Sequence, residues 1–247
     1  MEPIYRQSFH ISDNEVDRYG RLTPSKLLFF VQDVAGRHFD RLAMDYDALL
    51  EKNLFWAVIR HRVQITRLPR RDETITVETW PMPTTRVAYP RSVIAYDAEG
   101  KECFRAISLW VLMDLKSRAM VLPGKSGISV EGTLRGNELT APGSLVPKDL
   151  SNIRQRAVCF TDLDRNGHMN NTRYLDWIDD LLPSSFHERH PVKEFVICYL
   201  SEARESEQLQ LRWEVQEDAS LLIDGGRLSA ADGAVHTRVF AAKILFE

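Results

Sequence analysis

A short polar run in the second half of the chain carries an acid, an amide and an imidazole within five residues. Asp164, Asn166 and His168 are spaced two apart, and the amides Asn170 and Asn171 follow after one methionine. An imidazole can transfer protons near neutral pH, and an amide N–H can stabilise an oxygen atom that gains negative charge. The same residue types are also common in a solvated turn that ends in an asparagine helix cap. The spacing alone leaves acid–base catalysis and a structural turn as open alternatives.

The first half of the chain predicts a strand, a long helix and then an antiparallel meander. Thr23 and Pro24 suit an N-cap and a first helical position, and apolar residues follow at helical spacing up to Leu42. Beyond this helix, apolar or alternating runs separated by turn residues predict four strands, at 56–65, 75–79, 93–95 and 107–115. A helix that lies across such a sheet gives two packed layers.

The second half repeats this order after a segment rich in glycine and proline, residues 117–150, which we interpret as a linker with short strand pieces. A strand is predicted at 156–160, then a helix capped by Asn170 or Asn171 and stopped by Pro183. Four further strands are predicted, at 194–201, 209–215, 219–223 and 235–246, with Asp224-Gly225-Gly226 as a turn.

The two halves also match residue by residue. Val16–Leu22 aligns with Leu163–Met169 at a constant offset of 147 residues, and both segments lie between a first strand and a helix. We therefore infer an internal duplication that produced two fused domains.

Composition excludes several classes of protein. The chain has 247 residues and a net charge of -3, so it lacks the overall basic field of a nucleic-acid-binding protein. No apolar run is longer than Phe195–Leu200, which is far shorter than the roughly 20 residues that a membrane span needs. The three cysteines are too few for a disulfide scaffold, and the N-terminal residues resemble neither a secretory signal nor a transit peptide. We expect a cytoplasmic location.

The polar run and its neighbours, Thr161–Tyr174, resemble the signature of acyl-acyl-carrier-protein thioesterases, the plant plastid enzymes and their shorter bacterial relatives. That signature is Ser or Thr, Asp-Leu-Asp, any residue, Asn, any residue, His, Val or Met, Asn-Asn, and Tyr three positions later; every position is filled here. Three segments of the first half, Leu54–Arg60, Thr74–Pro81 and Ser108–Asp114, are similar to three of the family's strands. The resemblance covers nearly the whole chain.

The resemblance implies an α+β fold of the double hotdog type, with two antiparallel sheets each wrapped around a long helix. It implies an N-terminal hotdog domain on the acyl-chain side at 1–120, a linker at 121–150 and a catalytic hotdog domain at 151–247. The implied activity is hydrolysis of fatty acyl-acyl-carrier-protein thioesters to free fatty acid, which ends chain elongation. The implied partner is acyl carrier protein, with no metal, no organic cofactor, no nucleic acid and no membrane; a homodimer is an open alternative.

The family's catalytic Asp, Asn and His fall on Asp164, Asn166 and His168, and its further acid falls on Glu202. In the family this acid follows a tyrosine and two basic residues and precedes a cysteine, whereas here the basic residues are absent and Ala203 replaces the cysteine. This departure favours a water molecule, activated by the histidine and the glutamate, as the attacking group. Direct attack by the glutamate, which forms an anhydride, is the competing route.

The remaining implied roles concern the substrate. We expect four residues to bind it, namely Trp56, Arg60, Asn170 and Asn171. We expect most aromatic residues of the first half to be core, and some of them to limit chain length, namely Phe29, Phe30, Phe39, Trp56 and Trp110. A series of arginines between strands either forms a solvated face or steers an acidic carrier protein; these are Arg60, Arg62, Arg67, Arg70 and Arg71.

Two other functions stay open beside the acyl-carrier-protein hydrolase. One is a hotdog thioesterase that acts on acyl-coenzyme A, and the other is a catalytically silent acyl-binding protein. A hotdog dehydratase also uses a histidine and an acid, but the Asp-x-Asn-x-His-x-Asn-Asn turn is the thioesterase pattern.

Overall fold

The computed structural model describes residues 3–42, 46–136, 138–229 and 231–247. It divides into two compact units, Met1–Pro142 and Gly143–Glu247, which are called unit 1 and unit 2 below. Within the described residues, no helix combines the length and the apolar character that crossing a membrane requires.

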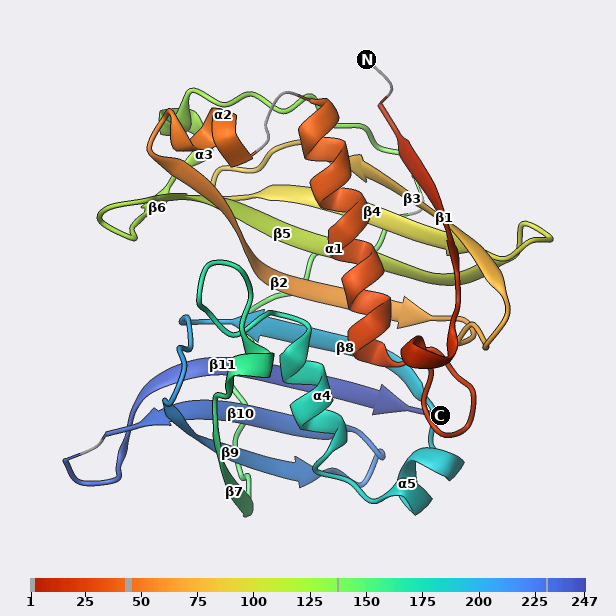
Figure 1. Cartoon of the computed structure of the whole chain (residues 1–247), viewed down its shortest axis with the longest axis vertical. Helices are drawn as coiled ribbons and strands as arrows, with labels where there is room; N and C mark the ends of the chain where they lie inside the picture. Colours follow the sequence, from red (N-terminus) through yellow and green to blue (C-terminus); the bar gives the residue numbers. More distant parts are fainter. Residues whose placement is uncertain (1–2, 43–45, 137, 230) are drawn as a thin grey trace. The chain divides into compact units, whose positions relative to one another are not determined.

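Unit 1 is an antiparallel sheet with one long helix lying across it (Figure 1). The strands are ordered β1-β3-β4-β5-β2, and the two-residue β6 adds to β5. Their bounds are β1 Tyr5–His10, β2 Leu54–Ile65, β3 Thr74–Pro81, β4 Tyr89–Tyr96, β5 Glu102–Asp114 and β6 Met120–Val121. Shorter elements complete the unit: η1 Asp13–Glu15, α2 Tyr46–Leu50 and α3 Pro123–Ser126.

The long helix is α1, Pro24–Arg41, and it begins where the sequence predicts. The Thr23 hydroxyl accepts a hydrogen bond from the Lys26 backbone N–H at 3.3 Å, and proline occupies the first helical position. The buried side of the helix packs aromatic rings against the sheet: Phe30 stacks on Phe9 with ring centroids 4.4 Å apart. The helix is therefore held by its cap and by an apolar face.

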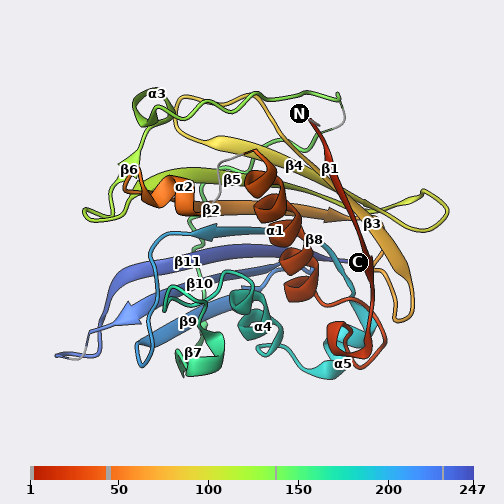
Figure 2. The ribbon, with the colours of Figure 1, turned by 45° about the horizontal axis from the view of Figure 1, so that its top comes forward.

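Unit 2 has the same plan, with a shorter helix (Figure 2). The strands are ordered β8-β11-β10-β9-β7, and all pair antiparallel. Their bounds are β7 Asn152–Ala157, β8 Val192–Tyr199, β9 Gln208–Val215, β10 Leu221–Leu228 and β11 Val235–Phe246. The helical elements are η2 Phe160–Asp162, α4 Arg173–Asp179 and α5 Ser184–Arg189.

The helix α4 has seven residues and is shorter than the long helix that the resemblance implies. Beyond it the backbone tightens, because Leu181 N donates to the Ile178 carbonyl and Leu182 N donates to the Asp179 carbonyl, three residues back in each case. Pro183 then has no N–H to continue the ladder. On its buried side, Tyr174 packs against Phe240 of β11 with centroids 4.8 Å apart.

Two predictions for unit 2 are corrected, one for a strand and one for a turn. The strand predicted at 156–160 is β7, which ends at Ala157. The predicted turn Asp224-Gly225-Gly226 instead lies inside β10, where the register shifts between the two glycines. Glycine is required for close packing here, because a Cβ on Gly225 would come within 2.1 Å of the Phe240 ring.

A buried histidine in unit 1 makes folding depend on pH. His61 of β2 lies with Nδ1 2.8 Å from the Ser108 hydroxyl and Nε2 3.3 Å from the Gln32 side-chain nitrogen. The residue is completely buried, and this burial lowers the pKa of its imidazole to about 3.

We expect the free energy of unfolding to fall by about 2 kcal/mol between pH 7 and pH 5 through His61 alone. In the unfolded chain its imidazole has an ordinary pKa of about 6.5, so over this range the unfolded state binds a proton that the folded state does not. The variant His61→Gln should lose this contribution in urea unfolding at the two pH values. The variant His236→Gln, at an exposed position, is the control. Equal pH dependence in wild type and His61→Gln would contradict the prediction.

Candidate active site

The polar run forms a tight loop that Asp164 organises. Its Oδ1 accepts hydrogen bonds from the backbone N–H of Asn166 at 2.8 Å and of His168 at 3.3 Å. Gly167 has a φ of +74°, a conformation that favours glycine, and its N–H donates to the Asp164 carbonyl at 3.0 Å. The carboxylate of Asp164 therefore holds the loop closed through the backbone.

Unit 1 contains the same loop with different side chains. Asp17 Oδ1 accepts from the backbone N–H of Tyr19 at 2.8 Å and of Arg21 at 3.0 Å, and Gly20 has a φ of +72°. The second oxygen of Asp17 accepts from the Arg21 side chain at 2.9 Å. In unit 2 the residue at the equivalent position is His168, whose ring has a different acidic partner.

That partner is Glu202, in the segment that follows β8. The loop reaches this segment because Met169 N donates to the Ala203 carbonyl at 2.8 Å and His168 forms a β-bridge with Arg204. His168 Nε2 then lies 3.2 Å from Glu202 Oε2. The histidine side chain is 16% exposed and the glutamate 40%, so the pair is open to solvent on the carboxylate side. An imidazole in contact with a carboxylate can accept and return a proton.

The three asparagines of the run have different surroundings. Asn166 is exposed, and its Nδ2 lies 3.5 Å from Asp164 Oδ2. The side-chain oxygen of Asn170 accepts from both the backbone N–H and the hydroxyl of Thr172 at 2.9 Å, so it shapes the turn before α4. Thr172, one residue beyond the predicted caps, is the N-cap. The backbone carbonyl of Asn171 accepts from the Tyr199 hydroxyl at 2.8 Å.

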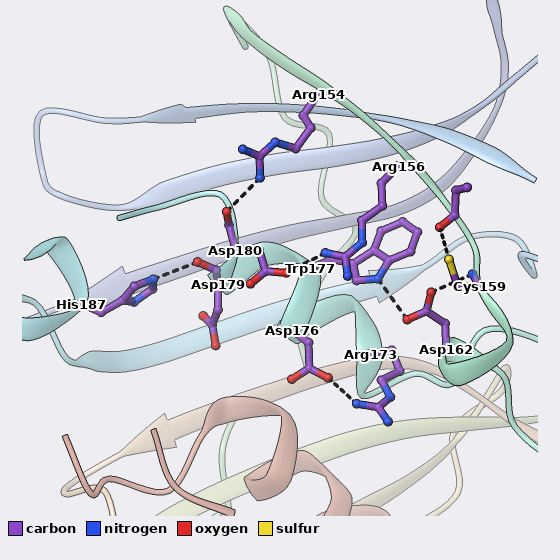
Figure 3. A network of polar contacts seen from close by, with 11 residues as sticks. Arg154, Arg156, Cys159, Asp162, Arg173, Asp176, Trp177, Asp179, Asp180 and His187 are labelled. Atoms are coloured by element: carbon purple, nitrogen blue, oxygen red, sulfur yellow. Dashed lines mark hydrogen bonds and ion pairs between the residues drawn. The ribbon is translucent and has the colours of Figure 1, made fainter. Parts of the chain in front are cut away.

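A buried aspartate, the first Asp of the Asp-Leu-Asp signature and so far without a predicted role, supports this loop (Figure 3). Asp162 is 7% exposed; its Oδ1 accepts from Trp177 Nε1 at 3.2 Å and its Oδ2 from the Cys159 backbone N–H at 2.9 Å. Its backbone carbonyl accepts from Asn170 N at 2.8 Å. The guanidinium of Arg156 lies over the indole ring, 4.6 Å from the ring centroid of Trp177. Asp162 thus ties both ends of the loop to α4.

Beside its place in the signature, the sequence signal for a structural role of Asp162 is its spacing from Cys159. The pair repeats the capping box of Ser12 and Glu15 in unit 1 at the same offset of 147 residues. Tyr199, which holds the start of α4, has no comparable signal. Burial strongly raises the pKa of its hydroxyl, so it stays a neutral hydrogen-bond donor.

The two predicted substrate-binding residues of unit 1 contact different groups. Trp56 stacks on Phe39 of α1 with centroids 4.7 Å apart and meets the edge of Tyr89 at 4.9 Å. Arg60 Nη1 instead donates to the Pro142 carbonyl at 3.2 Å. Trp56 therefore belongs to an aromatic cluster, and Arg60 fixes the segment that ends unit 1.

The arginine series of unit 1 is largely engaged within that unit. Arg67 and Arg71 form ion pairs with acidic residues, and Arg60 and Arg62 donate to residues 140–142. These contacts favour a structural role for the series over a patch that steers a partner. In the part of the chain that is described, no three His, Cys, Asp or Glu side chains come together as ligands for a metal ion.

Both halves of the chain match models of known protein families. The model of the acyl-ACP thioesterase N-terminal domain matches residues 2–122, and that of the acyl-ACP thioesterase C-terminal domain matches residues 146–242. Together they cover most of both units, and the chain belongs to the acyl-ACP thioesterase family.

Curated relatives are similar at low identity. The chain is 24% identical over 225 residues to a chloroplastic palmitoyl-acyl carrier protein thioesterase of Arabidopsis thaliana, covering 84% of this chain and 54% of that protein. It is 25% identical to a chloroplastic dodecanoyl-[acyl-carrier-protein] hydrolase of Cinnamomum camphora, covering 84% of this chain and 58% of that protein. The chain thus spans about half the length of these relatives.

Solved structures confirm the predicted double hotdog fold. An acyl-ACP thioesterase from Bacteroides thetaiotaomicron matches with a TM-score of 0.89 and 23% identity, over 99% of this chain and 98% of that chain. A 12:0-ACP thioesterase from Umbellularia californica matches with a TM-score of 0.83 and 21% identity, over 100% and 98%.

Proposed function

We propose that this chain hydrolyses fatty acyl-acyl-carrier-protein thioesters to free fatty acid and carrier protein, and so ends chain elongation. The observation that carries the proposal is the contact of 3.2 Å between His168 and Glu202, made by a loop with the family's complete signature. Family membership and the names of the curated relatives support the choice of substrate.

In the proposed reaction, the pair activates a water molecule. His168 and Glu202 take a proton from the water while its oxygen attacks the thioester carbonyl carbon. The carbonyl electron pair moves to its oxygen, and the exposed amide of Asn166 donates a hydrogen bond to the resulting oxyanion or positions the water. Collapse of the intermediate breaks the C–S bond, and the proton held by the pair returns to the leaving thiolate. Asp164 acts by holding the loop.

Glu202 as a direct nucleophile is the alternative route. Its carboxylate would attack the same carbon, expel the thiolate and form an anhydride that water then hydrolyses. The contact with His168 supports the water route, because an imidazole beside the carboxylate can receive the proton of the water. Ala203 supplies no thiol for a cysteine route.

We further propose a division of labour between the parts of the chain. Residues 151–247 contain the four proposed catalytic residues, residues 1–120 would hold the acyl chain, and residues 121–150 link them. The aromatic cluster around Trp56 supports an acyl-binding role for unit 1. A cytoplasmic location, supported by the small number of cysteines, stays a prediction, and so does a homodimer.

A panel of acyl chains presented on acyl carrier protein and on coenzyme A tests the proposal. We expect kcat/KM to be higher with acyl carrier protein for at least one chain length, and the activity to be lost in Glu202→Ala. Activity on coenzyme A alone would contradict the proposed partner and indicate an acyl-coenzyme A thioesterase. Binding of acyl chains without hydrolysis on either carrier would contradict an enzyme and indicate an acyl-binding protein.

A further inference from the structure

A buried arginine in unit 1 has two nitrogen atoms without an acceptor. Arg91 of β4 is 1% exposed. Its Nη1 lies 3.0 Å from His38 Nδ1 and donates to the Thr79 hydroxyl at 3.2 Å. Among the described residues, its Nε and Nη2 have no hydrogen-bond partner. Buried charges in proteins are normally paired, so this guanidinium is an incomplete site.

The two unpartnered atoms form the edge of a guanidinium that binds carboxylates with two parallel hydrogen bonds. Unit 2 shows this use of the same edge: Arg212 Nε and Nη2 donate to the two oxygens of Asp224 at 2.9 and 2.7 Å. A single neutral oxygen would leave the charge of Arg91 uncompensated. An anion with two oxygens on one carbon matches both the charge and the spacing.

The surroundings of Arg91 are aromatic. Its guanidinium lies 4.3 Å from the ring centroid of Phe39, which stacks on Trp56 and meets Trp110 edge to face at 5.8 Å. Trp56 in turn contacts Tyr89. The indole N–H of Trp110 is a second kind of buried donor with no partner among the described residues. Nε and Nη2 of Arg91 are themselves buried, so a ligand would reach them only where the neighbouring aromatic side chains give way.

We propose that the interior of unit 1 binds an aliphatic carboxylate, with the carboxylate on Nε and Nη2 of Arg91 and the chain against the aromatic cluster of Phe39, Trp56, Tyr89 and Trp110. The aliphatic chain rests on the proposed function, whereas the carboxylate rests on Arg91 itself. Two molecules offer this chemistry: a free fatty acid, and an acyl chain with a second carboxylate at its far end.

Calorimetric titration of the full chain tests the carboxylate. The probes are dodecanoate, its methyl ester and the monomethyl ester of dodecanedioic acid. We expect at least one of the two probes with a carboxylate to bind tenfold or more tightly than methyl dodecanoate, and Arg91→Met to abolish this preference. Arg71→Met, which removes an exposed arginine of the same unit, should leave the preference unchanged. Equal affinities of acid and ester, or no binding of either acid, would overturn the proposal.

Two further measurements complete the test. If Arg91→Met does not fold, the unfolding temperature of the wild type is measured with each probe. At least one acid should raise it more than methyl dodecanoate does, and equal shifts would overturn the proposal. For the source of the carboxylate, kcat/KM is compared between dodecanoyl and 11-carboxyundecanoyl thioesters. A higher kcat/KM for the 11-carboxyundecanoyl thioester would identify an acyl chain with a far-end carboxylate as the ligand. If this preference is absent and dodecanoate binds, the ligand is a free fatty acid. The binding measurements need no turnover, so a failure of the proposed hydrolysis leaves them interpretable.

Discussion

Replacing either His168 or Glu202 by alanine should lower kcat by roughly two to four orders of magnitude, the usual scale for a group that transfers a proton. The two side chains are 3.2 Å apart and act on the same water molecule in the proposed reaction. Residues that act as a unit are not additive, so the double variant should be little worse than the slower single variant. Steady-state rates on an acyl-carrier-protein thioester, with folding checked by circular dichroism, measure the effect.

Neighbouring residues of the same types supply the controls. Glu205 is exposed three positions after Glu202, and His187 Nε2 of α5 contacts the Asp179 carbonyl at 2.9 Å. We expect Glu205→Ala and His187→Ala to keep kcat within a small factor of wild type. Near-normal turnover in both His168→Ala and Glu202→Ala would refute the proposed pair.

Much of the fold could be predicted because its signals are local. The start of α1 is set by Thr23 and Pro24, and its buried face by helical spacing. The end of α4 is harder to predict from the sequence. The pattern of apolar residues continues to Leu181, whereas the α-helix ends at Asp179. The glycines of β10 led to the wrong prediction of a turn for a related reason. Gly225 is required because the ring of Phe240 packs against it, and this contact exists only in the folded sheet.

The residues of the proposed site also differ in whether local sequence signals reveal them. Asp164, Asn166 and His168 lie within one loop, so their association is visible in the sequence. Glu202 came only from the resemblance, since its approach to His168 depends on the pairing of the loop with the segment after β8. Arg91 gave no signal, because its lack of a carboxylate partner is a property of the packed core.

The buried Asp162 should matter more for stability than for chemistry. The variant Asp162→Ala leaves the indole N–H of Trp177, a side chain that is 1% exposed, without its acceptor, and it removes the acceptor of the Cys159 N–H. An unsatisfied buried donor costs about 1–3 kcal/mol, and loss of a capping contact about 1 kcal/mol. We expect the free energy of unfolding to fall by about 2–4 kcal/mol in urea titrations.

A double-mutant cycle with Trp177→Phe isolates the indole hydrogen bond, and the coupling energy should be about 1 kcal/mol because the two side chains are in direct contact. Asp176→Ala, on the same helix, removes only an exposed pair with Arg173 and should change stability by less than about 1 kcal/mol. Because Asp164 still closes the loop in Asp162→Ala, the folded variant should lose much less kcat than His168→Ala does. A loss of kcat as large as that of His168→Ala, without loss of stability, would instead place Asp162 in the chemistry.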